Sequence, residues 1–240
     1  MKTIALSGTG KGCGKTTVGT FIAGQLHDVA AFKVTPKHKT SLGAAEFELP
    51  VSGDDLSSST SSTSSGASAS SMVVDDPEVL LTRGTDTRRY WDAGAEPVRW
   101  VRARDEGVLE VIGDLSAETA ASVAPSLLIV ESTRYVARGG ASDVALMIYP
   151  NGETTVSNAA MDALAHCDAI VVTKWRPGPL QLSLFDDPRF PQEKLDLPVF
   201  AFNVDNDNLA LDDRYRMQEW LAEKLDLQQV PHTSDTAVRV

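Results

Sequence analysis

The sequence predicts an α/β fold, built as a doubly wound, mostly parallel β-sheet with helices on both faces. Short apolar runs typical of buried strands alternate with helical patterns along the whole chain. Residues 2–35 read as a strand, a glycine-rich loop, a helix and a second strand, which together form one βαβ unit. With 240 residues, 42% of them hydrophobic, the chain can bury one core of this kind. We therefore expect a single domain over residues 1–240.

Hydrophobic periodicity places the individual elements. Strands are expected at residues 3–6, 30–35, 97–102, 108–112, 126–131, 144–149, 169–173 and 199–203. Helices are expected at residues 15–27, 87–93, 116–123, 155–166 and 212–225, with a further helix start at 75–78. The strand at 126–131 is a near-continuous apolar run, which indicates burial on both faces of the sheet.

One segment lacks any apolar pattern. Residues 57–71 contain ten serines in fifteen positions, and the remainder are Thr, Ala and Gly. Such a composition cannot bury apolar area, so it predicts a disordered insertion. A phosphorylated regulatory segment is the alternative.

Composition and charge exclude several classes of partner. Acidic residues outnumber basic ones by 33 to 22, giving a formal net charge of -11, which disfavours duplex nucleic acid and anionic membrane surfaces. No stretch approaches the roughly 18 apolar residues of a membrane span, and the apolar run at the N-terminus is too short for a signal peptide. Cys13 and Cys167 are too few for a disulfide framework or a metal cluster. We expect a cytoplasmic protein that binds neither nucleic acid nor membrane.

A glycine-rich loop follows the first strand and reads Ser-Gly-Thr-Gly-Lys-Gly-Cys-Gly-Lys-Thr-Thr over residues 7–17. The strict phosphate-loop motif has glycine where this chain has Thr9, but the glycines still let backbone N–H groups converge on phosphate oxygens at a helix N-terminus. Lys15 can then reach the β- and γ-phosphates, and the Thr16 hydroxyl can ligate Mg²⁺. The expected nucleotide-binding residues of this loop are Gly8, Thr9, Gly10, Lys11, Gly12, Cys13, Gly14, Lys15, Thr16 and Thr17. A glycine-rich turn with an accidental Gly-Lys-Thr is the alternative.

Two other side chains of the loop have two interpretations each. Lys11 is either a catalytic charge stabiliser for the transferring phosphoryl group, acting across a dimer interface, or a solvated loop lysine. Cys13 lies among loop N–H groups and near Lys15, so it is either a redox-sensitive thiol or a small residue that fills the loop.

Polar residues at strand ends extend the predicted site. Glu131 closes the strand at 126–131, so its carboxylate is expected in the ligand crevice, where it would hold Mg²⁺ or orient an attacking water. Asp143, which precedes the next strand, is a weaker candidate. Thr173 and Lys174 end another strand and could contact the base. Because Arg176 stands where a guanine-reading motif has an acid, guanine specificity is not predicted.

Residues 83–95, Arg-Gly-Thr-Asp-Thr-Arg-Arg-Tyr-Trp-Asp-Ala-Gly-Ala, resemble a segment of the molybdopterin-guanine dinucleotide biosynthesis protein B family. The N-terminal phosphate loop, Lys37-His38 after the second strand and the apolar strand ending at Glu131 agree with that family. The resemblance implies a P-loop NTPase, a nucleotide-binding and weakly GTP-hydrolysing homodimer that assists attachment of a nucleotide to molybdopterin. It implies that Lys15 and Thr16 bind phosphate and Mg²⁺, that Glu131 is the acid near the metal, and that Lys37, Asp86 and Arg88 belong to the site.

The phosphate loop is also similar to that of dethiobiotin synthetase, in which a carboxylated amine is activated by the γ-phosphate. A lysine after the second strand assists there, and Lys33, Lys37 or Lys39 could take that part here. Three functions therefore stand at the sequence level. They are a Mg²⁺-dependent GTP or ATP hydrolase acting as a maturation factor with a partner enzyme, an ATP-dependent kinase, ligase or cyclase with a second small-molecule substrate, and a nucleotide-dependent binding module without turnover.

Overall fold

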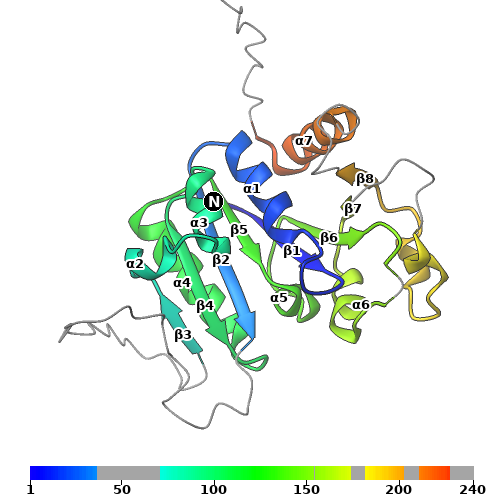
Figure 1. Ribbon diagram of the computed structural model, residues 1–240, viewed down its shortest axis with the longest axis horizontal. Helices are drawn as coiled ribbons and strands as arrows, with labels where there is room; N and C mark the ends of the chain where they lie inside the picture. Colours follow the sequence, from blue (N-terminus) through cyan, green and yellow to red (C-terminus); the bar gives the residue numbers. More distant parts are fainter. Residues whose placement is uncertain (37–70, 154, 174–181, 203–210, 228–240) are drawn as a thin grey trace, which may run out of the picture.

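One eight-stranded sheet forms the centre of the molecule (Figure 1). The computed structural model describes residues 1–36, 71–153, 155–173, 182–202 and 211–227. Its strands are β1 (Lys2–Gly8), β2 (Val29–Pro36), β3 (Ser71–Val74), β4 (Val98–Ala103), β5 (Leu127–Glu131), β6 (Val144–Pro150), β7 (Ala169–Thr173) and β8 (Val199–Phe202). They follow the order β3-β4-β2-β5-β1-β6-β7-β8, and β3 is the antiparallel member at one edge.

Helices cover both faces of this sheet. The helices are α1 (Lys15–Gln25), α2 (Pro77–Leu80), α3 (Asp86–Asp92), α4 (Val108–Ser122), α5 (Thr133–Ala137), α6 (Asn158–Leu164) and α7 (Leu211–Leu225). Buried residues of α1, α3 and α7 pack on one face, and those of α4, α5 and α6 pack on the other. Alternate residues of β1 enter the two cores, with Ile4 and Leu6 in one and Ala5 in the other. The predicted doubly wound α/β fold is therefore confirmed.

The prediction of a strand at residues 108–112 is wrong, because these residues form the first turns of α4. Val108, Val111, Ile112 and Leu115 are buried at helical spacing on one face of that helix. The β-branched residues suggested a strand, and the shared apolar face of a fifteen-residue helix overrides that local preference.

The edge strand β3 is a second difference from the sequence prediction. Ser71, expected to end the disordered insertion, is instead the first residue of this strand and pairs with Ala103 of β4. Residues 57–70 of the predicted insertion lie outside the described residues. Two short 3-10 helices, Ser183–Asp186 and Gln192–Lys194, were not expected either.

Over the ranges that the structure describes, no helix combines the length and the apolar character needed to cross a bilayer.

Candidate functional site

The loop between β1 and α1 lies at the carboxyl end of the central strand. Gly12 and Gly14 have φ of 73° and 99°, in the left-handed region, and Gly14 caps the N-terminus of α1. A Cβ at Gly14 would also lie 3.0 Å from the side chain of Thr173 on β7. Glycine is therefore required there by both conformation and space. The first N–H groups of α1 consequently face the loop without intrahelical partners, as an anion-binding helix terminus requires.

Lys15 folds back over this loop. Its ammonium donates to the Gly10 carbonyl oxygen at 3.0 Å and to Cys13 Sγ at 3.4 Å. Cys13 is buried against the loop, so its sulfur occupies interior space and is not presented to solvent. Neither of these contacts is with a carboxylate. An incoming phosphate would therefore offer this ammonium its first anionic partner among the contacts that the structure shows.

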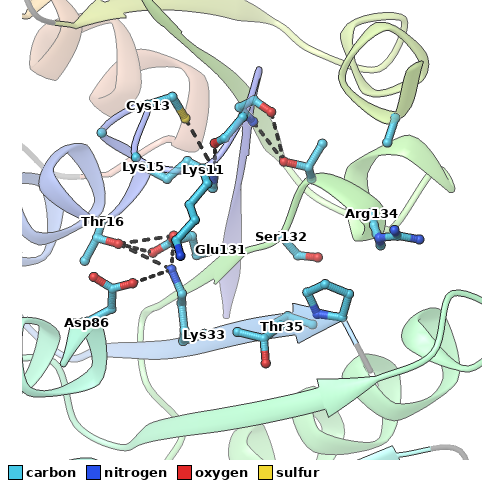
Figure 2. Close-up of a pocket in the computed structure, with 18 of the residues that line it drawn as sticks. Lys11, Cys13, Lys15, Thr16, Lys33, Thr35, Asp86, Glu131, Ser132 and Arg134 are labelled. Atoms are coloured by element: carbon cyan, nitrogen blue, oxygen red, sulfur yellow. Dashed lines mark hydrogen bonds and ion pairs between the residues drawn. The ribbon is translucent and has the colours of Figure 1, made fainter. Parts of the chain in front are cut away.

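Glu131 is the centre of a polar cluster that joins four elements (Figure 2). Its carboxylate, on a residue only 1% exposed, accepts hydrogen bonds from Thr16 Oγ1 of α1 at 2.9 Å and from Tyr90 Oη of α3 at 3.1 Å. Lys33, from β2, donates to the same carboxylate and forms an ion pair with Asp86 Oδ2 at 2.7 Å. A buried charge is retained only with partners of this kind.

Electrostatics keep the groups of this cluster in defined protonation states. Burial acts to lower the pKa of Lys33, but the Glu131 and Asp86 carboxylates outweigh it, so the pKa is raised. Burial acts to raise the pKa of Asp86, but its contact with the Lys33 ammonium outweighs it and the pKa is lowered. Burial, and then the charge of Glu131, raise the pKa of Tyr90 well above its ordinary range. At neutral pH the cluster therefore contains an ammonium, an ionised Asp86 and a neutral phenol donor.

Tyr90 reaches Glu131 only because α1 has a glycine where the ring passes. A Cβ built at Gly19 would lie 2.0 Å from Tyr90 Oη and 2.8 Å from Leu6 Cδ1. Tyr90 itself is fully buried, so it has no open space into which it could move. The close approach of α1 and α3 thus places the phenol on the carboxylate.

We expect Gly19→Ala to destabilise the protein by about 1–3 kcal/mol, the usual cost of overpacking a core. Gly24→Ala, in the same helix, is the matched control, because its Cβ would meet only the Ala93 carbonyl oxygen at 3.9 Å. That control should be neutral or stabilising by roughly 0.5–1 kcal/mol, since alanine is the better helix former. Urea unfolding of the two variants measures the difference. Equal stabilities would show that α1 can shift away from Tyr90 at little cost.

A cavity of about 720 Å³ opens between the phosphate loop and the carboxyl ends of the neighbouring strands. Loop residues and the Glu131 cluster line one part of it. The remainder is lined by Val34, Thr35, Pro36, Ala103, Asp105, Val108, Ser132, Thr133, Arg134, Ser157 and Ala159. In this second part Arg134 forms an ion pair with Asp105, and Figure 2 shows Arg134 beyond Ser132, apart from the Lys33 cluster.

The structure brings most of the predicted site residues to this cavity. The lining includes Gly8, Gly10, Lys11, Gly12, Cys13, Gly14, Lys15, Thr16, Thr17, Asp86 and Glu131. Lys37, His38 and Lys174 lie outside the described residues. Thr9 belongs to the loop, but its side chain is buried and does not line the cavity.

Three predicted residues have other surroundings. Arg88 turns away from the cavity, and its Nε donates to Asp92 at 2.7 Å. Thr173 Oγ1 donates to the Cys13 carbonyl oxygen at 2.6 Å, so this hydroxyl links the end of β7 to the backbone of the phosphate loop. Asp143 accepts from Lys2 and the Thr3 N–H at the opposite end of β1, far from the loop.

Sequence reasoning missed three side chains of the site: Arg89, Tyr90 and Arg134. Arg89 lies one position after the expected Arg88 and donates to Thr17 Oγ1 at 3.0 Å. The spacing from Asp86 could have identified Arg89 and Tyr90. They stand three and four positions later and so share its face of the helix. Lys33 was only one of three candidate lysines, although its charge inside an apolar strand marked it as a residue that needs a buried partner.

Known proteins offer one distant structural similarity and no sequence match. No protein-family model matches the chain, and no curated protein matches its sequence. Among solved structures, HypB from Helicobacter pylori in complex with nickel is similar, with a TM-score of 0.48 and 10% identity. The match covers 97% of this chain and 91% of that one. A similarity of this size assigns neither a ligand nor an activity to the present chain.

Oxygen donors near the loop fit a magnesium ion that shares its ligands with a phosphate. Thr16 Oγ1 and the Glu131 carboxylate lie together beside the start of α1, and Asp86 is the next carboxylate. Mg²⁺ is commonly held by one or two carboxylates plus substrate phosphates and water. Over the described ranges, no three His, Cys, Asp or Glu side chains form an all-protein metal site. Water or the phosphates of a nucleotide would complete the ligands of a metal held by these residues.

Proposed function

We propose that this chain is a single nucleotide-binding domain that binds a nucleoside triphosphate with Mg²⁺ at the phosphate loop and cleaves its terminal phosphoryl group. One observation carries the proposal. The glycine loop, with Lys15 folded over it, leads directly into α1. At the start of this helix, the Thr16 hydroxyl donates a hydrogen bond of 2.9 Å to the buried carboxylate of Glu131. Phosphate, metal and acid positions are thereby within reach of one another.

The residues divide the work of such a reaction. The loop N–H groups and Lys15 would hold the phosphates, and Lys11 would add positive charge where negative charge develops. Thr16 and Glu131 would hold Mg²⁺, which neutralises phosphate charge when bound. Tyr90 donates to the Glu131 carboxylate and keeps it in position for this role.

Residues 83–95 and the far part of the cavity support two more specific forms of this function. The resemblance of residues 83–95 favours a GTP- or ATP-hydrolysing maturation factor in molybdopterin-type cofactor biosynthesis, acting in the cytoplasm as a homodimer with a partner enzyme. The cavity beyond Lys33, toward Asp105 and Arg134, favours the second candidate, an ATP-dependent kinase, ligase or cyclase. That space lies past the loop, where a second small-molecule substrate would have to bind.

Thermal unfolding with a panel of nucleotides, followed by a phosphate-release assay, tests the proposal. We expect GTP or ATP with Mg²⁺ to raise the melting temperature, while the corresponding nucleoside without phosphates does not. Phosphate release without a co-substrate supports the hydrolase. Release that requires a second compound supports the kinase or ligase, and binding without release supports a non-hydrolysing module. No stabilisation by any triphosphate would contradict all three.

A further inference from the structure

The ammonium of Lys33 lies among oxygen atoms supplied by three separate elements. It donates to the Glu131 carboxylate on β5, forms an ion pair with Asp86 Oδ2 on α3 at 2.7 Å, and lies 3.4 Å from Thr16 Oγ1 on α1. Figure 2 shows the side chain extending from β2 toward these three residues. Two carboxylates and a hydroxyl are the oxygen ligands that a hard divalent cation takes.

Two of these three residues are the ones that the proposed function assigns to Mg²⁺. A divalent ion on Thr16 Oγ1 and Glu131 would lie within a few ångströms of the Lys33 ammonium. Their repulsion would be strong, because the Glu131 carboxylate is buried and little water screens the charges. The lysine contact and the metal contact therefore exclude each other.

We propose, on the basis of the proposed function, that Lys33 is an internal counter-cation that takes the place of Mg²⁺ until nucleotide binds. The ammonium neutralises Glu131, which would otherwise be a buried carboxylate with only the hydroxyl donors of Thr16 and Tyr90. It leaves Glu131 when the metal enters and keeps Asp86, a half-exposed carboxylate that lines the cavity.

This arrangement makes metal entry depend on the nucleotide. Metal alone must displace an ammonium that has two carboxylate partners, and it gains only Thr16 and Glu131 in return. A metal that arrives with a triphosphate brings phosphate ligands of its own and offers Lys33 a new anionic partner.

Binding of Mn²⁺ without nucleotide tests the lysine directly, with electron paramagnetic resonance reporting the free ion. We expect Lys33→Met to bind Mn²⁺ about tenfold or more tightly than the unchanged chain, within the range by which neighbouring groups alter metal affinity. Lys2→Met is the matched control, since it removes the same charge from the far end of β1, where Lys2 pairs with Asp143. The control should bind Mn²⁺ as the unchanged chain does.

Thermal unfolding with Mn²⁺ and a double variant keep the test decisive even if Lys33→Met folds poorly. If Lys33→Met is unstable in buffer, Mn²⁺ should restore its melting transition, because the ion replaces the missing cation. A variant that stays unfolded in millimolar Mn²⁺ contradicts the proposal, as does a folded variant that binds Mn²⁺ no more tightly. The double variant Lys33→Met/Glu131→Gln should lose the gain, and a retained gain would overturn Glu131 as the shared ligand.

Nucleotide binding by the unchanged chain separates this inference from the proposed function. Stabilisation by Mg²⁺ and a triphosphate, without tighter Mn²⁺ binding by Lys33→Met, overturns the role of Lys33 alone. Absence of that stabilisation overturns the proposed function, and the inference with it.

Discussion

Lys15→Ala is expected to abolish the stabilisation that a nucleoside triphosphate gives this protein. At about 100 times its Kd, a ligand adds about 2.7 kcal/mol, which is a rise of roughly 5–10 °C for a chain of this size. Removing the ammonium that contacts the phosphates costs up to about 3 kcal/mol of binding. At the same nucleotide concentration the variant should therefore show a rise below about 2 °C.

The substitution should leave the folded state almost unchanged without ligand. Within the part of the chain that the structure describes, the hydrogen bonds of Lys15 go to the Gly10 carbonyl oxygen and Cys13 Sγ, and neither is with a carboxylate. Lys2→Ala removes an exposed lysine from the same strand-and-helix unit and should keep the full nucleotide shift. An unchanged shift in Lys15→Ala would show that the glycine loop is not the phosphate site.

Much of the fold could be predicted because its buried strands are short apolar runs that are easily recognised in the sequence. Residues 127–131 and 169–173 are fully buried, and near-continuous apolar runs of this length have few other interpretations. The edge strand β3 could not be predicted, since only four partly buried residues form it and their pairing with β4 is set by tertiary contact. Tertiary packing also explains why the sequence predicts a strand at 108–112 and a separate helix at 116–123 where the structure has the single helix α4. The β-branched residues at 108–112 favour a strand locally, but they share one buried face with the rest of the helix.

The site, like the fold, has residues that local sequence predicts and residues that only tertiary packing sets. The loop, Thr16 and Glu131 follow from local sequence, because a glycine loop after a strand and an acid at a strand end both fix positions at one sheet edge. The contact of Tyr90 with Glu131 depends on how closely α3 approaches α1 at Gly19, which no local pattern encodes. The choice of Arg89 over Arg88 depends on the exact start of α3, and helix boundaries are the least predictable feature of a sequence.

Glu131→Gln is expected to slow phosphate release by about 10²–10³-fold while leaving the nucleotide Kd within a few-fold of its original value. A carboxylate that holds Mg²⁺ or orients water acts mainly on the transition state, and losses of this size are typical when one such group is removed. Glutamine keeps the shape and one acceptor oxygen for Thr16 and Tyr90. It removes the charge that faces Lys33, so we also expect a loss of roughly 1–3 kcal/mol in unfolding free energy.

The control for this substitution is Glu118→Gln on α4, where the carboxylate pairs with Arg99 on the surface, away from the cavity. It should change neither phosphate release nor nucleotide binding, and its effect on stability should be small, as for exposed ion pairs generally. Comparing kcat with Kd below the melting transition of Glu131→Gln separates chemistry from folding. If both fall together in the folded variant, Glu131 supports the loop structurally and the attacking water is positioned by another group.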